Sequence, residues 1–399
     1  MPSPVAVPLL RVLGVAALAV AMCCPSTAAR AQNEPYDVNV ILPLTGVGAF
    51  IGQTQAAAFK VVEKRINATG GIDGRPVRFV EADNQSDPQV DVQLTGALIA
   101  KHVPVIVDGG PATDCNAAAP LYARGPLMYC LSPAFYPEKD GYAFAGGVTS
   151  RDGLRAIVNY LRGKGWTRIA ILTLTDVAGQ EADQALHDLL ALPVNRAFNV
   201  VGWEHYAPRD LSVTTQLAKL RAGNPQALIG WATGTPVGTM FHGLVDAAWD
   251  VPFMGSNANQ QAGSLVQLAS VLPRDYYMFS LPWAAYSRMK DGVLKAATGA
   301  YLDALHDGGL QPDGGNAMVW DSMMIVTSAL RKLGTQATAD QLKGYISGLH
   351  NFDGAGGSFN FTSGNQRGLG PENCIVVRWD RATGAWIPVS GPDGSTLPS

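Results

Sequence analysis

Short apolar runs alternate with longer helical segments along most of the chain, and this alternation constrains the fold more than any other feature. Residues 104–107 and 127–131 are two such runs, and one helical segment, residues 114–122, lies between them. Each run is too short for a helix and is typical of a strand buried on both faces. Strands that alternate with helices form a parallel sheet covered by helices on both faces. The sequence therefore predicts an α/β fold.

The alternation occurs twice, which predicts two Rossmann-like lobes of similar size. The first set begins with the apolar run 38–44, and the second begins with the helical segment 152–163. No low-complexity linker separates the two sets. We therefore expect strands to run directly from one lobe to the other. The best candidates are residues 142–148 and 276–281, which are apolar and extended.

Residues 1–31 have the pattern of a cleaved signal peptide. Arg11 supplies a positive charge, the apolar run 12–24 is too short to span a bilayer, and Ala29-Arg30-Ala31 is a small-x-small cleavage site. We expect the mature chain to begin at Gln32, to be soluble and to lie in the periplasm. No later run is long and apolar enough for a transmembrane helix.

Two cysteines at the end of the apolar run raise lipid anchoring as an alternative. A lipoprotein signal needs a small residue just before the lipidated cysteine. Met22 precedes Cys23, and a cysteine precedes Cys24. The sequence therefore favours cleavage without a lipid anchor.

Composition excludes several classes of protein. The 399 residues are 47% hydrophobic and 15% charged, which is typical of a globular protein and not of a disordered chain. The net charge of −3 argues against nucleic acid as a partner.

Two loops are the first candidates for a binding site. Residues 109–113 and 132–134 follow neighbouring strands of the predicted sheet. Open α/β sheets bind ligands at the carboxyl ends of their strands. The first loop leads into a helix N-terminus, where free N–H groups favour an anion. The alternative is that both are simple turns, with Thr113 or Asp114 as the helix N-cap.

Three cysteines remain in the mature chain, namely Cys115, Cys130 and Cys374. The first two fall at the ends of the two loops. A disulfide between them is plausible in an oxidising compartment, where it would stabilise the fold by roughly 3 kcal/mol. Three buried thiols are the alternative.

Motifs of catalysis are weak or missing. Gly46, Gly48 and Gly52 follow a strand, and Glu81 and Asp83 lie at the end of the next strand. This pattern resembles the dinucleotide fingerprint of an NAD-dependent enzyme. However, the last gap is one residue too long, and an exported protein would lack a diffusible nicotinamide cofactor. The sequence has no Gly-x-Ser-x-Gly, His-Glu-x-x-His or Gly-Lys-Ser/Thr motif. We expect a binding protein without cofactor or metal.

The chain resembles the leucine/isoleucine/valine-binding protein family. The residues that carry the resemblance include the unusual run Gly-Gly-Ile-Asp-Gly-Arg-Pro and lie at positions 43–46, 52, 66–67, 70–76, 86–88, 118–120, 132–134 and 176–179. The resemblance implies a type I periplasmic solute-binding protein, whose two lobes are joined by three crossing segments and close on a ligand. It places the crossings near residues 148, 281 and 352. It also implies one lobe of residues 32–147 plus 283–352 and another of residues 148–282 plus 353–399.

The resemblance also implies a ligand site between the lobes. The loop after the third strand normally contributes a small residue beside Ser or Thr, and the next loop offers N–H groups and a hydroxyl to the ligand carboxylate. The residues expected at the site are Phe50, Ile51, Ala112, Thr113, Ser132, Ala134, Phe135, Tyr136, Ala178, Thr233, Thr235 and Asn257.

Three departures from the family pattern bear on the ligand. Ile51 and Ala178 stand where the family often has Tyr, and Asn257 stands where amino-acid binders often place an acid for the ligand ammonium. A buried unpaired charge costs several kcal/mol. We therefore expect a carboxylate without an obligatory α-amino group. The added space would take an aromatic ring, stacked on Phe50 or Phe135.

Asp114 leaves an alternative open. If its carboxylate points into the cleft, it could replace the missing acid, whereas as a helix N-cap it would not. The resemblance further implies permease subunits of an ABC importer as partners of a monomeric protein. A sensor of the same fold that acts on a membrane receptor is the alternative.

Overall fold

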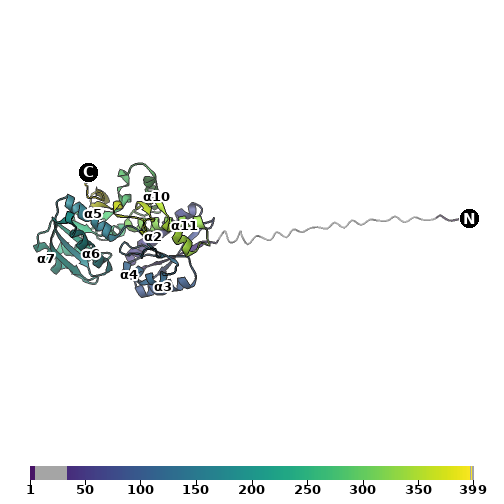
Figure 1. The fold of residues 1–399 in the computed structure, drawn as a ribbon, viewed down its shortest axis with the longest axis horizontal. Helices are drawn as coiled ribbons and strands as arrows, with labels where there is room; N and C mark the ends of the chain where they lie inside the picture. Colours follow the sequence, from purple (N-terminus) through teal and green to yellow (C-terminus); the bar gives the residue numbers. More distant parts are fainter. Residues whose placement is uncertain (5–33, 396, 398–399) are drawn as a thin grey trace.

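The chain forms two α/β lobes that lie side by side (Figure 1). The computed structural model describes residues 1–4, 34–395 and 397. Apart from its first four residues, the predicted signal peptide lies outside the described residues, and so do Cys23 and Cys24. The cleavage site and the lipid anchor therefore stay predictions.

Lobe 1 is built on a sheet of five parallel strands in the order β2-β1-β3-β4-β5. The strands are β1 (Tyr36–Leu42), β2 (Val77–Asp83), β3 (Val105–Asp108), β4 (Leu127–Cys130) and β5 (Ala143–Ala145). Every residue of β3 and β4 is buried, as predicted for strands covered on both faces. The predicted parallel sheet is confirmed.

Helices from two distant parts of the sequence cover this sheet. The earlier helices are α2 (Ala49–Ala68), α3 (Pro88–Ala100), α4 (Ala112–Ala118) and the short η1 (Ala119–Tyr122), and the later ones are α10 (Val293–Asp307), α11 (Gly314–Leu333) and α12 (Ala339–Ser347). Helix α11 packs along α2, and α3 packs on α4. Asp87 caps α3 by accepting from the N–H of Gln89, and Pro88 occupies the first turn.

Lobe 2 is built on a sheet of seven strands in the order β14-β13-β10-β9-β8-β6-β7. Its strands are β6 (Arg168–Leu174), β7 (Asn199–Tyr206), β8 (Ala227–Trp231), β9 (Phe253–Gly255), β10 (Tyr276–Ser280), β13 (Ile375–Asp380) and β14 (Ala385–Ser390). The first five are parallel, whereas β13 runs antiparallel to β10 and to β14. Its helices are α5 (Ser150–Gly163), α6 (Val177–Leu190), η2 (Pro193–Asn195), α7 (Thr214–Ala222), α8 (Pro236–Asp246), η3 (Asn257–Asn259) and α9 (Ala262–Gln267).

Three passages join the lobes, and the third lies later than predicted. The first runs from β5 to α5, and the second runs from β10 through η4 (Pro282–Arg288) to α10. The hairpin of β11 (His350–Asp353) and β12 (Ser358–Asn360) packs on α10, and Gln366 and Arg367 still hydrogen-bond lobe 1. The chain enters the second sheet only at β13, after η5 (Pro371–Asn373). The third passage therefore follows Arg367, and the predicted crossing near Phe352 is wrong. The family resemblance could not reveal the contacts of Gln366 and Arg367 with lobe 1.

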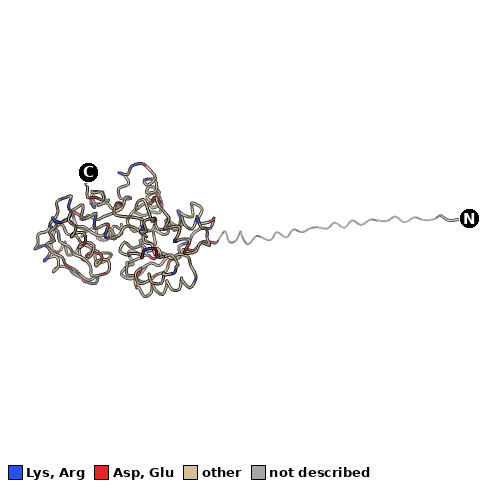
Figure 2. Tube along the Cα trace, in the orientation of Figure 1, with Lys and Arg blue, Asp and Glu red and all other residues tan. Residues whose placement is uncertain are grey.

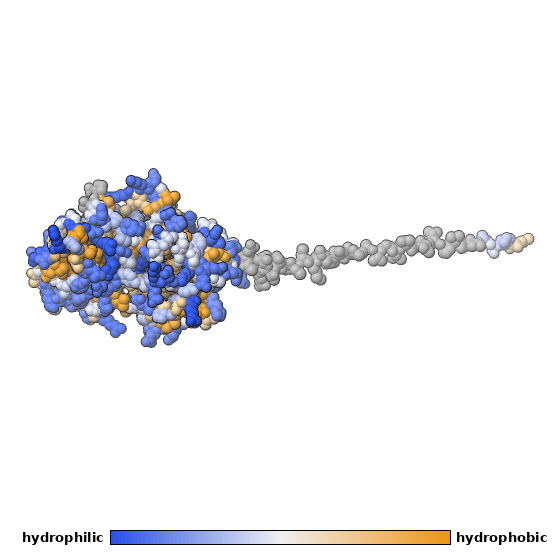
Figure 3. Space-filling view, in the orientation of Figure 1, coloured by the Kyte–Doolittle hydropathy of each residue, from blue (hydrophilic) through white to orange (hydrophobic). Residues whose placement is uncertain are grey.

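Charges of both signs are spread over both lobes (Figure 2). The face in Figure 3 is mostly hydrophilic, with separate hydrophobic patches. Within the described part of the chain, no helix is long and apolar enough to cross a membrane.

Candidate functional site

The lobes meet where the parallel strands of each sheet end. The N-terminal part of α6, in lobe 2, lies against the loop after β4 and the start of α4, in lobe 1: Ala178 packs against an apolar cluster that contains Ala112, Ala134 and Phe135. Thr54 of α2 hydrogen-bonds Gln261 of lobe 2 at 3.3 Å. Since open α/β sheets bind ligands at this edge, the space between the lobes is the candidate site.

Two glycines allow helices to begin close to the strands that precede them. A Cβ atom on Gly52 would lie 2.3 Å from the carbonyl oxygen of Pro43, and one on Gly179 would lie 1.8 Å from that of Leu174. Any side chain at these positions would push α2 or α6 away from its strand. The backbone approach thus explains why glycine stands at both positions.

The structure brings the predicted site residues into two groups. The first is the apolar contact of Ala112, Ala134, Phe135 and Ala178. In the second, Phe50 and Thr235 line a cavity of about 380 Å³ between α2 and the start of α8. Of the remaining predicted residues, Ser132 and Asn257 are buried, Ile51, Thr113 and Thr233 are half-buried, and Tyr136 is exposed.

Phe135 does not offer its ring to a ligand. Its exposed fraction is 2%, and it packs in the lobe 1 cluster with Ala143 and Ala145. The prediction that Phe135 is a stacking surface is therefore wrong, because its ring fills the core beside the sheet. Phe50, which is half-buried and lines the inter-lobe cavity, is the other ring named from the sequence.

Arg367 holds the loop after β4, and it is not among the site residues predicted from the sequence. Its guanidinium donates to the carbonyl oxygens of Ser132 at 3.3 Å and Pro133 at 3.1 Å, and also to that of Phe135. A further bond of 3.0 Å reaches the carbonyl oxygen of Gly146, in the first passage between the lobes. One buried side chain thus fixes the loop that was expected to bind the ligand carboxylate.

Arg367 forms no ion pair in the described part of the chain, although the carboxylates of Asp152 and Glu181 lie near enough to raise its pKa. The side chain is 2% exposed. Burial lowers the pKa of Arg367 to about 10, so it remains charged at neutral pH. A buried cation whose acceptors are all carbonyls favours an anion beside the loop that it holds.

Tyr136 joins the same loop to lobe 2. Its hydroxyl donates to Glu181 of α6, and the guanidinium of Arg367 lies 5.5 Å from the centre of its ring. Burial raises the pKa of Glu181, while the hydrogen bond from Tyr136 opposes the rise. The contact therefore links the loop after β4, in lobe 1, to the helix that carries Ala178.

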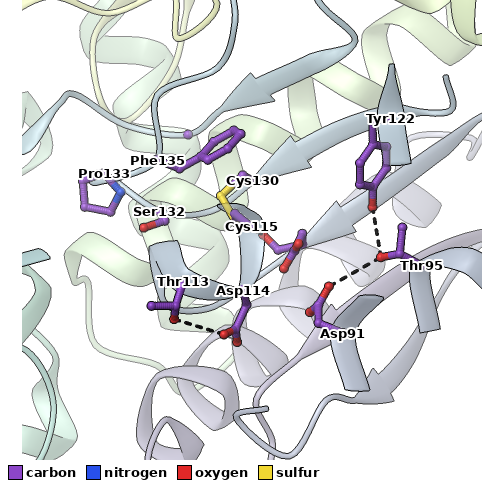
Figure 4. Close-up of a disulfide and its surroundings, with 12 residues drawn as sticks. Asp91, Thr95, Thr113, Asp114, Cys115, Tyr122, Cys130, Ser132, Pro133 and Phe135 are labelled. Atoms are coloured by element: carbon purple, nitrogen blue, oxygen red, sulfur yellow. Dashed lines mark hydrogen bonds between the residues drawn. A yellow bond between two sulfur atoms is a disulfide. The ribbon is translucent and has the colours of Figure 1, made fainter. Parts of the chain in front are cut away.

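Asp114 is neither a helix cap nor a cleft acid. Helix α4 begins at Ala112, and Pro111 is its N-cap, so Asp114 lies inside the first turn. The carboxylate is 1% exposed and accepts from Asn84 at 2.9 Å. It also accepts from the hydroxyl of Thr113 at 3.1 Å (Figure 4). The cap role is wrong because Pro111 occupies the N-cap position. The cleft role is wrong in this structure because the carboxylate is buried and bonded to Asn84 and Thr113.

A disulfide joins Cys115 to Cys130, across 15 residues of sequence (Figure 4). It connects the first turn of α4 to the end of β4, and hence the elements that carry the two candidate loops. Cys374 is a free, buried thiol. Within the described residues, no group of His, Cys, Asp and Glu is arranged to hold a metal ion.

Asp108 is a buried carboxyl group beside the site. It ends β3 and is fully buried, and neither of its oxygens has a hydrogen-bond partner among the described residues. Burial, reinforced by the charges of Asp91 and Asp114, raises the pKa of Asp108 well above its usual range. Burial also raises the pKa of Asp91 to about 6.

These carboxyl groups should make the protein more stable in mild acid. A group with a raised folded-state pKa holds a proton that the unfolded chain releases, so stability falls as pH rises from the unfolded to the folded pKa. Each such proton contributes a slope of about 1.4 kcal/mol per pH unit. We expect Asp108→Asn to flatten the fall in unfolding free energy between pH 5 and pH 7, as measured by urea unfolding. The matched control is Asp303→Asn, on the exposed face of α10. An equal pH slope in the two variants would contradict the assignment of this pH dependence to Asp108.

The glycine-rich turn before α2 does not offer a dinucleotide site. The carboxylate of Asp83, one of the two acids in the fingerprint-like pattern, accepts from the N–H of Leu44 at 2.9 Å and the hydroxyl of Thr45 at 2.7 Å. The N–H of Gly48 donates to the hydroxyl of Ser86 at 2.9 Å. These groups already hydrogen-bond within the chain, so the turn is a structural one.

Comparison with known proteins agrees with this architecture. A family model described as periplasmic binding protein matches residues 35–385. The chemotactic signal transduction system substrate-binding protein BasB of Halobacterium salinarum is 29% identical over 136 residues, which are 32% of this chain and 33% of that protein. The match thus spans about a third of the relative's length.

Two solved structures show the same fold at low sequence identity. The fatty acid ABC transporter substrate-binding protein of Thermomonospora curvata has a TM-score of 0.74 at 19% identity, over 92% of this chain and 95% of that one. LivJ of Streptococcus pneumoniae, a branched-chain amino acid transporter substrate-binding protein in complex with isoleucine, has a TM-score of 0.71 at 17% identity, over 91% and 98%. With two open α/β sheets, three passages between them and a family match over most of its length, the chain belongs to the periplasmic binding protein family and has the type I fold.

Proposed function

We propose that this protein captures a small carboxylate between its lobes, outside the cytoplasm, and delivers it to an ABC importer of the branched-chain amino acid type. The observation that carries the proposal is the buried cation under the ligand loop. Arg367 hydrogen-bonds three carbonyl oxygens of residues 132–135, and this buried charge, which has no ion-pair partner among the described residues, favours an anionic group at that loop. The loop's backbone N–H groups, the Ser132 hydroxyl and Thr113 are the proposed contacts of the carboxylate.

The ligand does not need an α-amino group. Asn257 stands where an acid would pair with the ammonium, and Asp114, the other candidate, is bonded within lobe 1. The names of two structural relatives mention a fatty acid and isoleucine, both of which are carboxylates. The chemistry shared by these ligands supports a carboxylate, while the missing acid argues against an amino acid.

A thermal-shift screen tests the proposal directly. Purified mature protein is heated with amino acids, aromatic acids, aliphatic acids and the corresponding neutral amides. A ligand that binds only the folded state raises the melting temperature. We expect a carboxylate to raise it clearly and its amide, which binds more weakly, to raise it less. Tight binding of leucine or valine, with no response to other acids, would contradict the argument from Asn257.

Ala178 should limit the size of the ligand. It is half-buried at the start of α6 and packs against the lobe 1 cluster, so a larger side chain there would fill the space between the lobes. We expect Ala178→Tyr to weaken an aromatic acid at least tenfold, or about 1.4 kcal/mol, and to spare a small acid. Calorimetry measures both affinities. Val177→Tyr, at the more exposed preceding position, is the matched control. Equal losses for both ligands would refute the size argument.

Sensing is the second candidate function, and the name of the BasB relative favours it, since that protein belongs to a chemotactic signal transduction system. A binding protein for transport supports uptake of its ligand in cells, whereas a sensor does not. Deletion of the gene followed by uptake of the radiolabelled ligand separates the two. Unchanged uptake with lost chemotaxis would favour sensing.

Export, cleavage after residue 31 and a monomeric state belong to the same proposal. N-terminal sequencing of the secreted protein tests the cleavage, and an acylated Cys23 would contradict it. Size-exclusion chromatography with light scattering tests the monomeric state. The lobe boundaries remain part of the proposal as well, with the third passage placed after Arg367.

A further inference from the structure

A second cavity lies beside the passages between the lobes, with walls from both of them. Its volume is about 500 Å³. Trp283 of η4 belongs to the second passage, Leu302 of α10 belongs to lobe 1, and Trp379 and Trp386 come from the β13–β14 hairpin of lobe 2. Val266 of α9 lies at its exposed edge. None of the predicted site residues lines this cavity, so it is separate from the candidate ligand site.

The walls combine three tryptophans with aliphatic side chains and carry no charge. Trp386 packs edge to face with Trp379 at 5.1 Å between ring centroids, and with Tyr276 behind it at 5.5 Å. None of the described residues that line the cavity is Asp, Glu, Lys or Arg. An ion in this space would have no counter-charge, and transfer of an unpaired ion from water is unfavourable. The cavity therefore suits a neutral, largely apolar molecule, and its three tryptophans favour an aromatic one.

Three N–H donors around the cavity lack acceptors. Indole Nε1 of Trp283, indole Nε1 of Trp386 and amide Nε2 of Gln260 are buried and have no hydrogen-bond partner among the described residues. Gln260 is 1% exposed and Trp283 is 6% exposed. The amide of Gln260 is oriented by its oxygen, which accepts from the hydroxyl of Ser280 at 3.0 Å.

Such donors are unusual, because most buried polar groups in proteins are hydrogen-bonded and an unpaired one is destabilising. All three belong to residues that line one cavity, and all three are donors. A molecule that carries a carbonyl or ether oxygen could supply the missing acceptor after small side-chain movements. The bound molecule should therefore be apolar over most of its surface and carry one acceptor oxygen.

We propose that this cavity binds a neutral aromatic molecule that carries a hydrogen-bond acceptor. The aromatic rings of Trp283, Trp379 and Trp386 contact the flat body of the molecule, and the indole and amide N–H groups donate to its oxygen. Since the walls belong to both lobes, the bound molecule bridges them at the passages.

Coumarin is a suitable probe, because it is a neutral bicyclic compound with a carbonyl acceptor. The mature protein without cleft ligand is titrated with coumarin, and binding is followed by tryptophan fluorescence and by calorimetry. We expect saturable binding at one site with Kd below about 100 µM. Naphthalene has a similar shape but no acceptor, and we expect it to bind at least fivefold more weakly. No saturable binding of coumarin, or equal affinity for naphthalene, would overturn the proposal and indicate that water serves the donors.

A pair of exposed valines gives matched variants. Val266 is 78% exposed and lines the cavity, whereas Val293 is 75% exposed and does not. We expect Val266→Trp to weaken coumarin at least tenfold and Val293→Trp to change it less than twofold. Trp386→Phe, which removes one donor, should weaken coumarin at least threefold. Equal effects of the two valine variants would refute the location.

The cleft variant separates this proposal from the proposed function. Ala178→Tyr alters the inter-lobe site and is expected to leave the affinity for coumarin unchanged. If Ala178→Tyr abolished coumarin binding while Val266→Trp had no effect, coumarin would bind in the cleft and the second site would be wrong. Failure of the carboxylate screen, by contrast, would not affect coumarin binding.

Discussion

Arg367→Met is expected to weaken binding of the carboxylate ligand roughly tenfold and to lower the free energy of unfolding by about 3 kcal/mol or more. The loss of stability follows from four carbonyl oxygens, those of Ser132, Pro133, Phe135 and Gly146, which lose a charged donor. Unpaired buried polar groups cost about 1–3 kcal/mol each, although relaxation and water reduce the sum. The loss of affinity has a separate cause, because the variant lacks the positive charge of the guanidinium beside the loop.

The two effects can be separated by a control and a second ligand. Arg331 also donates to backbone carbonyls, at 2.7 Å to Gly71 and 3.0 Å to Ile66, but it ties α11 to the end of α2 in lobe 1. Arg331→Met should reduce stability and leave ligand affinity unchanged. The neutral amide of the same ligand should bind the Arg367→Met variant within threefold of the native protein.

Urea unfolding and calorimetry measure these effects on the same samples. Arg367→Lys keeps the charge and should recover part of the affinity for the carboxylate. If Arg367→Met changed the affinities for acid and amide equally, the arginine would act only by shaping the loop. The electrostatic argument for a carboxylate would then fail.

The sheets were predictable, because local patterns specify them. The apolar runs of β3 and β4 are too short for helices, and each is followed by small or turn-forming residues. The same pattern located the loops at the carboxyl ends of the strands, and hence the edge at which the lobes meet. Residues such as Ala112, Ala134 and Ala178 could be placed near that edge for this reason.

Long-range contacts were not predictable from one sequence. Arg367 lies 232 positions from Phe135, whose carbonyl oxygen it binds, and no local pattern marks it as buried. Because Arg367 is bound to lobe 1, the third passage follows Arg367, whereas the sequence predicted it near Phe352. Asp114 was misjudged for a local reason: Pro111, extended at φ −61° and ψ 150°, serves as N-cap and lets α4 start at Ala112. A carboxylate expected at the helix start therefore lies within its first turn and is bonded to Asn84.

Removal of the disulfide, by Cys115→Ala with Cys130→Ala, is expected to lower the free energy of unfolding by roughly 3 kcal/mol. A cross-link over 15 residues mainly restricts the unfolded chain, and this loop length corresponds to about that free energy. Dithiothreitol should destabilise the native protein by the same amount and leave the double variant unchanged. Cys374→Ala is the control for the free thiol, and it should still respond to dithiothreitol.

The disulfide also bears on the buried carboxyl groups beside it. The sulfur of Cys115 lies 4.0 Å from the carbonyl oxygen of Asp108, so a loosened α4 would admit water to a carboxyl group that has no partner among the described residues. Hydration would bring the pKa of Asp108 closer to its usual range. We therefore expect the double variant to lose stability and also to show a flatter pH slope between pH 5 and pH 7. Urea unfolding at three pH values measures both effects. A loss below about 1 kcal/mol, with the pH slope unchanged, would show that α4 is held in place by its packing on α3 and not by the cross-link.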